Sequence, residues 1–156
     1  MITSMTDTVG ADPKPDSTGH RVALVTGAAG AIGAAIASRL ARRGVRVAVN
    51  DVDLDRATAV AGLLEEQTST RCAAFRAAIT DRAAVAEMVQ MAGEKLGVIG
   101  ILVNNAGVLG NALLEDLDDV RWDLVMDVHL RGAFLCSQAV IGDMKTGGWG
   151  RIVNIS

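Results

Sequence analysis

The amino-acid sequence predicts a doubly wound α/β domain built around a parallel β-sheet. Short apolar segments typical of buried strands alternate with segments in which apolar residues recur at helical spacing. This alternation occurs five times at roughly 30 residues per unit, the length of a βαβ crossover. Because such crossovers are right-handed, successive strands run parallel and helices cover both faces of the sheet. Five strands are therefore expected between residues 21 and 156.

The first strand–helix unit follows directly from this pattern. The apolar segment 22–26 predicts a buried strand. Ile32, Ile36 and Leu40 then recur at helical spacing, and Gly44 is expected to cap the end of that helix.

The middle of the chain repeats the pattern twice. A buried strand at 45–49 precedes an alanine-rich helix from about 54 to 67. A weaker strand at 71–77 leads to a third helix, whose N-terminus Asp81 is placed to stabilise. The apolar face of this helix consists of Val85, Met88, Val89, Ala92 and Leu96.

The last part of the chain places one long helix between two strands. A strand at 100–103 precedes an amphipathic stretch from about 118 to 145, which the glycine-rich segment 147–150 breaks. A fifth strand follows at 151–155. Since an uncovered edge of a parallel sheet is a poor surface to expose, this strand is expected to lower stability or promote aggregation.

The composition excludes several classes of protein. Half of the residues are hydrophobic and 21% are charged, which is typical of a soluble globular chain. A net charge of -3 provides no basic surface for nucleic acid or an anionic membrane. No apolar run approaches the roughly 20 residues that a membrane-spanning helix needs. With two isolated cysteines and two histidines, we expect neither a disulfide framework nor a metal site.

Residues 1–20 differ from the rest of the chain. They are polar, hold both prolines and lack the apolar stretch of a signal peptide. We therefore expect a flexible tail at 1–20, a single domain at 21–156 and a cytoplasmic location.

A glycine-rich segment stands between the first predicted strand and its helix. Gly27 allows a tight turn, Gly30 lets the backbone approach a pyrophosphate, and Gly33 lets the helix pack closely on the sheet. The helix N-terminus adds unpaired N–H groups and a partial positive charge. Small loops of this kind also occur as plain turns, but the position between a strand and a helix favours dinucleotide binding.

An acidic residue ends the second predicted strand. Asp51 lies 18 residues after Gly33, close to the offset of about 20 at which a carboxylate binds the adenosine ribose. The alternative for Asp51 is an exposed carboxylate that caps a helix, a role for which Asp53 competes. A carboxylate here would repel a 2′-phosphate, and Ala29 stands where a basic residue could offset it. NAD is therefore expected rather than NADP, with the nearby Arg56 as the counter-argument.

The motif after the fourth strand decides between two classes. S-adenosylmethionine-dependent methyltransferases also place a glycine loop after the first strand and an acidic residue after the second. Here, however, the segment 102–107 reads Leu-Val-Asn-Asn-Ala-Gly, and over residues 21–156 the chain resembles the short-chain dehydrogenase/reductase family. The likeness is to the N-terminal, cofactor-binding portion of its Rossmann-like fold. The matching segments are 26–33, 102–107, 131–134 and 150–156, together with Asp51.

The resemblance implies an NAD-dependent oxidoreductase that transfers hydride between nicotinamide and an alcohol or ketone carbon. The substrate would be a small molecule; a 3-oxoacyl carrier-protein reductase, a hydroxyacyl-CoA dehydrogenase and a non-catalytic dinucleotide-binding module remain as alternatives. The resemblance implies dimers or tetramers for full-length members rather than for this chain. The residues implied at the cofactor are Gly27, Ala28, Gly30, Ile32, Gly33, Asp51, Ile79, Asn105, Ala106 and Gly107.

Two positions depart from the family pattern. Ala78 stands where members often carry an acidic residue near the adenine, so the backbone of Ile79 is left to bind it. His129 stands where members usually have an active-site Asn, in the long helix. One interpretation makes His129 a catalytic residue that binds a relay water; the other makes it a partly buried histidine paired with backbone. Asn104 is expected to be structural.

The usual catalytic residues are missing. The chain contains no tyrosine, so the tyrosine that acts as general acid and base in the family cannot be present. Ser156 matches the first of two family serines, of which the second is catalytic. We therefore expect an N-terminal fragment of a longer enzyme, inactive by itself and without the C-terminal part of the fold.

Overall fold

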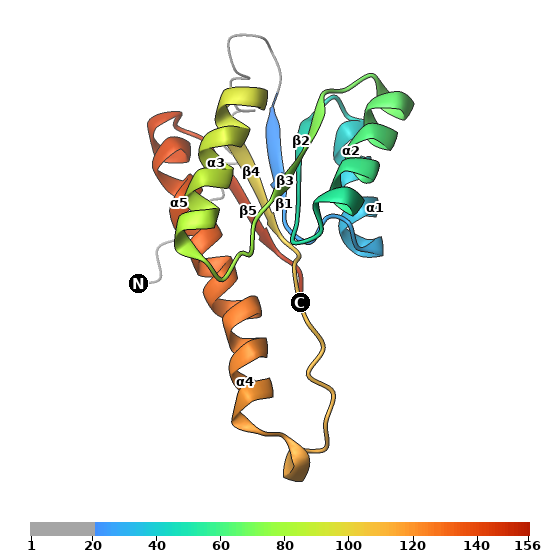
Figure 1. The fold of residues 1–156 in the computed structure, drawn as a ribbon. Coiled ribbons are helices and arrows are strands. Elements are labelled where there is room, and N and C mark those ends of the chain that lie inside the picture. Colours follow the sequence, from blue (N-terminus) through green and yellow to red (C-terminus); the bar gives the residue numbers. More distant parts are fainter. Residues whose placement is uncertain (1–20) are drawn as a thin grey trace, which may run out of the picture.

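The computed structural model describes residues 21–156, and the tail predicted at 1–20 lies outside the described residues (Figure 1). Five parallel strands form one sheet in the order β3-β2-β1-β4-β5. The strands are β1 (Val22–Val25), β2 (Arg46–Asp51), β3 (Cys72–Arg76), β4 (Ile99–Asn104) and β5 (Arg151–Asn154). The helical segments are α1 (Ala31–Ala41), α2 (Leu54–Thr68), α3 (Arg82–Leu96), the 3-10 turn η1 (Leu114–Asp116), α4 (Asp119–Met126), the π-helical η2 (Asp127–Gly132) and α5 (Ala133–Thr146).

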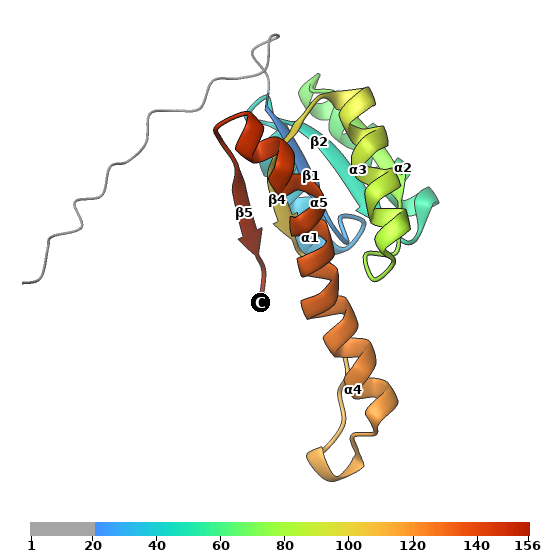
Figure 2. The same ribbon diagram turned by 90° about the vertical axis from the view of Figure 1, so that its left-hand side faces the viewer.

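Helices cover both faces of the sheet (Figure 1, Figure 2). On one face α1 and α2 pack over a buried cluster that includes Val25, Val47 and Leu64. On the other face α3 and α5 pack over a cluster that includes Leu24 and Met88. Leu24 and Val25 are consecutive in β1 and point to opposite faces, as the period of a strand requires. The predicted doubly wound α/β fold is confirmed.

The order of the strands reverses between β1 and β4. From β1 the chain moves outward through β2 to β3, and then returns to place β4 on the other side of β1. Val25 of β1 pairs with both Val49 of β2 and Val103 of β4, so the three strands end at the same edge. Open α/β sheets bind ligands at the carboxyl ends of their strands at such a reversal. The segments that follow β1, β2 and β4 therefore meet where a ligand is expected.

The helix ends follow the sequence chemistry. Asp81 caps α3 as predicted, because its Oδ1 accepts the backbone N–H groups of Ala83 at 2.8 Å and Ala84 at 3.2 Å.

Gly44 closes the end of α1 as predicted. It has a φ of +77°, and its N–H donates to the Ala41 carbonyl at 2.9 Å. The N–H of the next residue, Val45, donates to the Leu40 carbonyl at 3.2 Å, so the last carbonyls of the helix are satisfied as the chain turns into β2.

The long helix predicted at 118–145 is not regular. The helical run Asp119–Thr146 contains the π-helical segment η2 between α4 and α5. Its mean hydropathy reaches 1.3, and it is the one stretch among residues 21–156 long and apolar enough to cross a membrane. The expectation that no run reaches this length is therefore wrong. One such helix is weak evidence for a membrane span, because core helices meet the same criterion, and α5 buries Leu135, Cys136 and Val140 over β4.

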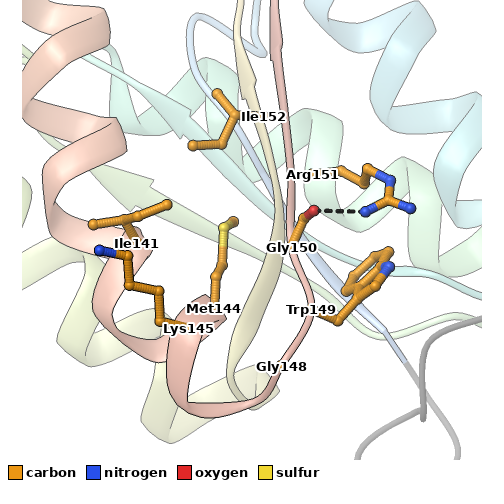
Figure 3. A pocket seen from close by; sticks show the side chains of 8 residues that line it. All are labelled: Ile141, Met144, Lys145, Gly148, Trp149, Gly150, Arg151 and Ile152. Atoms are coloured by element: carbon orange, nitrogen blue, oxygen red, sulfur yellow. Dashed lines mark hydrogen bonds between the residues drawn. The ribbon is translucent and has the colours of Figure 1, made fainter. Parts of the chain in front are cut away.

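A tryptophan marks the start of β5. The guanidinium groups of Arg21 and Arg151 each lie 5.2 Å from the centroid of the Trp149 ring. A side chain at Gly100 of β4 would come within 2.7 Å of this ring, so the glycine makes room for it. A groove of about 650 Å³ lies alongside, with Met144 on the other side of β5 from the ring (Figure 3). This groove is at the beginning of β5, whereas the glycine-rich loop follows the end of β1.

Candidate cofactor site

The glycine-rich loop joins β1 to α1 and leaves the start of the helix bare. Gly27 has a φ of +61°, and a Cβ there would lie 2.8 Å from the Cα of Ala106. A Cβ at Gly33 would lie 2.5 Å from the carbonyl oxygen of Gly27. Gly30 is the N-cap of α1, makes no side-chain cap, and would bring a Cβ only to 3.4 Å from the same oxygen. Two glycines are therefore required by packing, and Gly30 leaves the helix N–H groups open to an anion.

The turn after β4 clamps this loop. The buried Thr26 hydroxyl accepts the backbone N–H groups of Asn105 at 3.0 Å and Ala106 at 3.1 Å. In return, the Asn105 side-chain amide donates to the carbonyls of Thr26 at 2.9 Å and Gly27 at 3.2 Å. The Asn105 amide thus satisfies two backbone carbonyls at the end of β1. These hydrogen bonds between the turn and the loop preorganise the loop for binding a ligand.

Asn104 has the structural role that the sequence predicts. It is buried, and its side-chain amide donates to Asn154 Oδ1 at 2.9 Å and to Ser137 Oγ at 3.3 Å. It thereby ties the end of β4 to β5 and α5 and takes no part in the loop.

Asp51 lies beside the glycine-rich loop and Asp53 does not. Asp51 is half-buried at the end of β2, where its Oδ2 accepts the Ala29 N–H at 3.2 Å and its Oδ1 accepts the Asp53 N–H at 3.2 Å. Asp53 is the N-cap of α2 and accepts the Arg56 N–H at 3.1 Å. Asp53 is therefore the helix cap, and Asp51 is the one of the two that is bonded to the glycine-rich loop.

Ile79 follows β3 and packs under the long helix. Its side chain is buried, and any side chain at Gly132 in η2 would overlap its Cδ1. Ala78 is exposed beside it. The close contact with Gly132 holds the backbone of Ile79 at the same end of the sheet as the loop.

His129 lies in η2 with its ring against the segment that follows Ala106. Its Nε2 lies 3.1 Å from the backbone nitrogen of Val108 and 3.0 Å from the carbonyl oxygen of Val108. One tautomer accepts from the N–H and the other donates to the carbonyl. A Cβ at Gly107 would lie 2.6 Å from the ring, so this glycine permits the contact. The geometry matches the backbone-paired interpretation of His129, although the side chain is exposed rather than partly buried.

The comparisons with known proteins agree with this geometry. A family model described as short chain dehydrogenase matches residues 21–156. The chain belongs to the short-chain dehydrogenase family. The chain is similar to the hydroxy(phenyl)methylsuccinyl-CoA dehydrogenase subunit BbsD from Thauera aromatica, with 40% identity over 88% of this chain and 55% of the relative. It is also similar to the D-threitol dehydrogenase of Mycolicibacterium smegmatis, with 40% identity over 87% and 52%.

Solved structures show the same fold. The alcohol dehydrogenase of the archaeon Thermococcus sibiricus, complexed with 5-hydroxy-NADP, superimposes with a TM-score of 0.82 at 27% identity, over 86% of this chain and 57% of that one. This short-chain dehydrogenase chain thus spans about half the length of the curated relatives it matches.

The fold brings together most of the predicted cofactor residues of this short-chain dehydrogenase. The loop glycines, Asp51 and the segment 105–107 surround the carboxyl ends of β1, β2 and β4. Ile32 faces solvent in the first turn of α1, and Ala28 is buried, with its N–H bonded to Asn50 O at 2.8 Å.

Sequence reasoning missed the contacts that two residues make with the loop. Thr26 is a hydroxyl at the end of an apolar strand, a signal that could have identified it. Arg56 extends back from α2 and donates from Nη2 to the Ala29 carbonyl at 3.0 Å, a contact that its place in the sequence does not reveal.

Both cysteine thiols are buried. Burial raises the pKa of the Cys72 thiol to about 11 and that of Cys136 to about 12, so both are protonated and unreactive near neutral pH. Within residues 21–156, no three His, Cys, Asp or Glu side chains group in a way that could hold a metal ion.

Proposed function

We propose that this chain binds a nicotinamide adenine dinucleotide, NAD in preference to NADP, as the cofactor-binding part of an alcohol or ketone oxidoreductase. The observation that carries the proposal is the Asp51 carboxylate, bonded to the Ala29 N–H of the glycine-rich loop at 3.2 Å. A half-buried carboxylate there accepts hydrogen bonds from ribose hydroxyls and repels a 2′-phosphate.

The other residues have complementary roles in this proposal. The bare N-terminus of α1 receives the pyrophosphate, and the backbone of Ile79 borders the adenine. Asn105, Ala106 and Gly107 border the rest of the cofactor, and His129 positions Val108 next to them. When bound, the nicotinamide supplies the hydride chemistry.

The substrate is an alcohol or ketone, in keeping with the names of the relatives, which include a threitol dehydrogenase and a CoA-thioester dehydrogenase. We place the general acid and base outside these 156 residues, because none of them is a tyrosine. Two free thiols suit a reducing compartment such as the cytoplasm. The absence of tyrosine equally supports a second candidate, a dinucleotide-binding module without catalysis.

Calorimetric titration of the chain with NADH, NADPH and S-adenosylmethionine tests the binding proposal. We expect NADH to bind about tenfold more tightly than NADPH, and S-adenosylmethionine not to bind. Asp51→Asn should remove most of the preference, whereas Asp55→Asn, an exposed acid in the same segment, should keep it. Equal affinities of the original chain for NADH and NADPH would contradict the role of Asp51. An unchanged preference for NADH in Asp51→Asn would contradict it as well.

A turnover assay separates the two candidate functions. A chain that binds NADH but oxidises no alcohol, alone or joined to its downstream coding sequence, would support the non-catalytic module. Activity that appears only with the downstream sequence would support the oxidoreductase.

A further inference from the structure

The outer edge of β3 carries backbone groups that the sheet leaves unpaired, because β3 pairs with β2 alone. The carbonyl of Arg71 and the N–H of Ala77, which flank the strand, bond to β2 at 3.2 Å and 3.3 Å. Since the backbone groups of successive residues point to alternate edges of a strand, those of Ala74 and Arg76 point away from β2. Both residues therefore offer an N–H and a C=O group to a further strand.

Glu65 of α2 closes the beginning of this edge. Its Oε1 accepts the Cys72 N–H at 2.9 Å. Natural proteins block edge strands with charged side chains, because an open edge can pair with another chain. This bond covers the Cys72 end of β3, so the open part of the edge is 74–76.

A groove of about 570 Å³ lies along the open part of the edge. Its walls include Leu54 from α2 and Met91 from α3, two helices that flank β3 on opposite faces of the sheet (Figure 1). Both side chains are exposed, Leu54 at 44% and Met91 at 39% of their surface. Because successive side chains of a strand point to opposite faces, a strand in this groove would direct neighbouring side chains to Leu54 and to Met91.

The groove also carries an excess of positive charge. Arg76 and Lys95 line it together with one acidic residue, Glu94. The Glu94 carboxylate already accepts the Gln90 side-chain amide at 3.0 Å. The ion pairs within residues 21–156 include neither Arg76 nor Lys95. An acidic side chain is therefore the electrostatic complement of this groove.

We propose that the outer edge of β3 is a docking site for an extended segment of a partner protein, which joins the sheet as a further strand. The segment has two neighbouring apolar residues, which contact Leu54 and Met91, followed by an acidic residue, which faces the cations of the groove. Backbone hydrogen bonds to Ala74 and Arg76 supply affinity, and the side chains supply specificity. This site lies apart from the residues to which we assign the cofactor, so it does not rest on the proposed function.

The β3 strand of a second copy of this chain fits the groove less well than such a segment. Its Phe75 is buried in its own core and cannot fill the groove. Its Arg76 would add a cation where an acid is required. The partner is therefore a different, acidic polypeptide.

The probe is the peptide acetyl-Thr-Val-Leu-Glu-Val-Thr-amide, titrated into the 156-residue chain by calorimetry. We expect a Kd on the order of 100 µM, and an affinity about fivefold lower when lysine replaces the glutamate of the probe. Ala74→Pro removes an N–H that points away from β2, keeps the bonds between β3 and β2, and should weaken the probe about tenfold. Met91→Glu should weaken it to a similar extent, because it replaces an apolar wall with a negative charge.

Ile152→Pro is the matched control at the opposite edge of the sheet. The Ile155 N–H bonds to the Asn104 carbonyl at 3.0 Å, so the Ile152 N–H points away from β4 and its removal should leave probe binding unchanged. Circular dichroism and urea unfolding show whether each proline variant keeps its fold. If Ala74→Pro does not fold, Met91→Glu on the surface of α3 carries the test.

Four results would overturn the proposal. They are no binding of the probe to the original chain, unchanged binding in Ala74→Pro and Met91→Glu, equal losses in the two proline variants, and loss in Ile152→Pro alone, which would place the added strand at β5. Sedimentation of the chain by itself provides a further check. A dimer that Ala74→Pro abolishes would make a second copy the occupant and overturn the choice of a partner protein.

Discussion

The two edge strands of the sheet, β3 and β5, are covered very differently. In β3 the side chains of Cys72, Ala73 and Phe75 are buried, and the Glu65 carboxylate of α2 accepts the Cys72 N–H at 2.9 Å. Every residue of β5 is exposed, including Val153 at 45% of its surface. The exposure expected for the last strand is confirmed. An apolar parallel strand in this condition is held mainly by its pairing with β4.

This contrast separates the candidate site from the weakly covered edge. The glycine-rich loop, Asp51 and Arg56 all depend on β1, β2 and the turn after β4. Asn104, the last residue of β4, is bonded to Asn154 of β5 and to Ser137 of α5, and its side-chain amide donates to neither the loop nor the turn. We therefore expect damage at β5 to affect stability and solubility while leaving the geometry of the cofactor site in place.

The largest expected effect is the difference in the free energy of unfolding between a variant at the centre of the sheet and a variant at its uncovered edge. Leu24→Ala in β1 should lower the free energy of unfolding by about 2–5 kcal/mol, because the side chain is fully buried. Val153→Ala in β5 should lower it by less than about 1 kcal/mol. Urea unfolding of both variants measures the difference, and equal losses would mean that β5 is as well packed as β1.

Next in size are the loop glycines. Gly33→Ala places a methyl group 2.5 Å from the Gly27 carbonyl and 2.7 Å from the Asn105 amide, and should destabilise the chain by about 1–3 kcal/mol. NADH binding should fall with it, because the loop must shift. Gly30→Ala, with its nearest contact at 3.4 Å, is the matched control for stability. The interpretation fails if the two variants unfold at the same urea concentration.

Two asparagine variants test the same comparison, between the loop and β5, by removing side-chain hydrogen bonds. Asn105→Ala removes two bonds to the loop, and should cost about 1–3 kcal/mol and weaken NADH binding. Asn154→Ala removes the β5 partner of Asn104, and should cost about 1 kcal/mol with no change in NADH affinity. Calorimetry and urea unfolding together test this; weakened NADH binding in Asn154→Ala would show that β5 does support the site.

The fold could be predicted from the sequence because the buried strands and amphipathic helices have distinct apolar periods. The candidate site could be predicted in part, because Gly27, Gly33 and Asp51 act through local chain geometry that spacing reveals. The contacts of Thr26 and Arg56 could not be predicted, because they join segments brought together only by the order of the strands. The π-helical η2 was also missed, because the apolar pattern predicted one continuous helical stretch there.

One expected effect is confined to alkaline pH: the loss of stability caused by two buried thiols, which lie on opposite faces of the sheet. Burial raises the pKa of Cys72 in β3 to about 11 and that of Cys136 in α5 to about 12, from 9.0. Above pH 9 the unfolded chain loses these protons first, so their contribution is complete below pH 9 and is lost as the pH rises toward 11 and 12.

Cysteine-to-alanine variants isolate this contribution from the other groups that titrate at high pH. Urea unfolding between pH 8 and about 11 should show a shallower alkaline decline for Cys136→Ala than for the original chain, and a smaller change for Cys72→Ala. The comparison of slopes removes the constant cost of each cavity. Identical slopes in all three proteins would mean that α5 opens to solvent before Cys136 ionises, which would extend the weakness of the β5 edge to the helix that packs over β4.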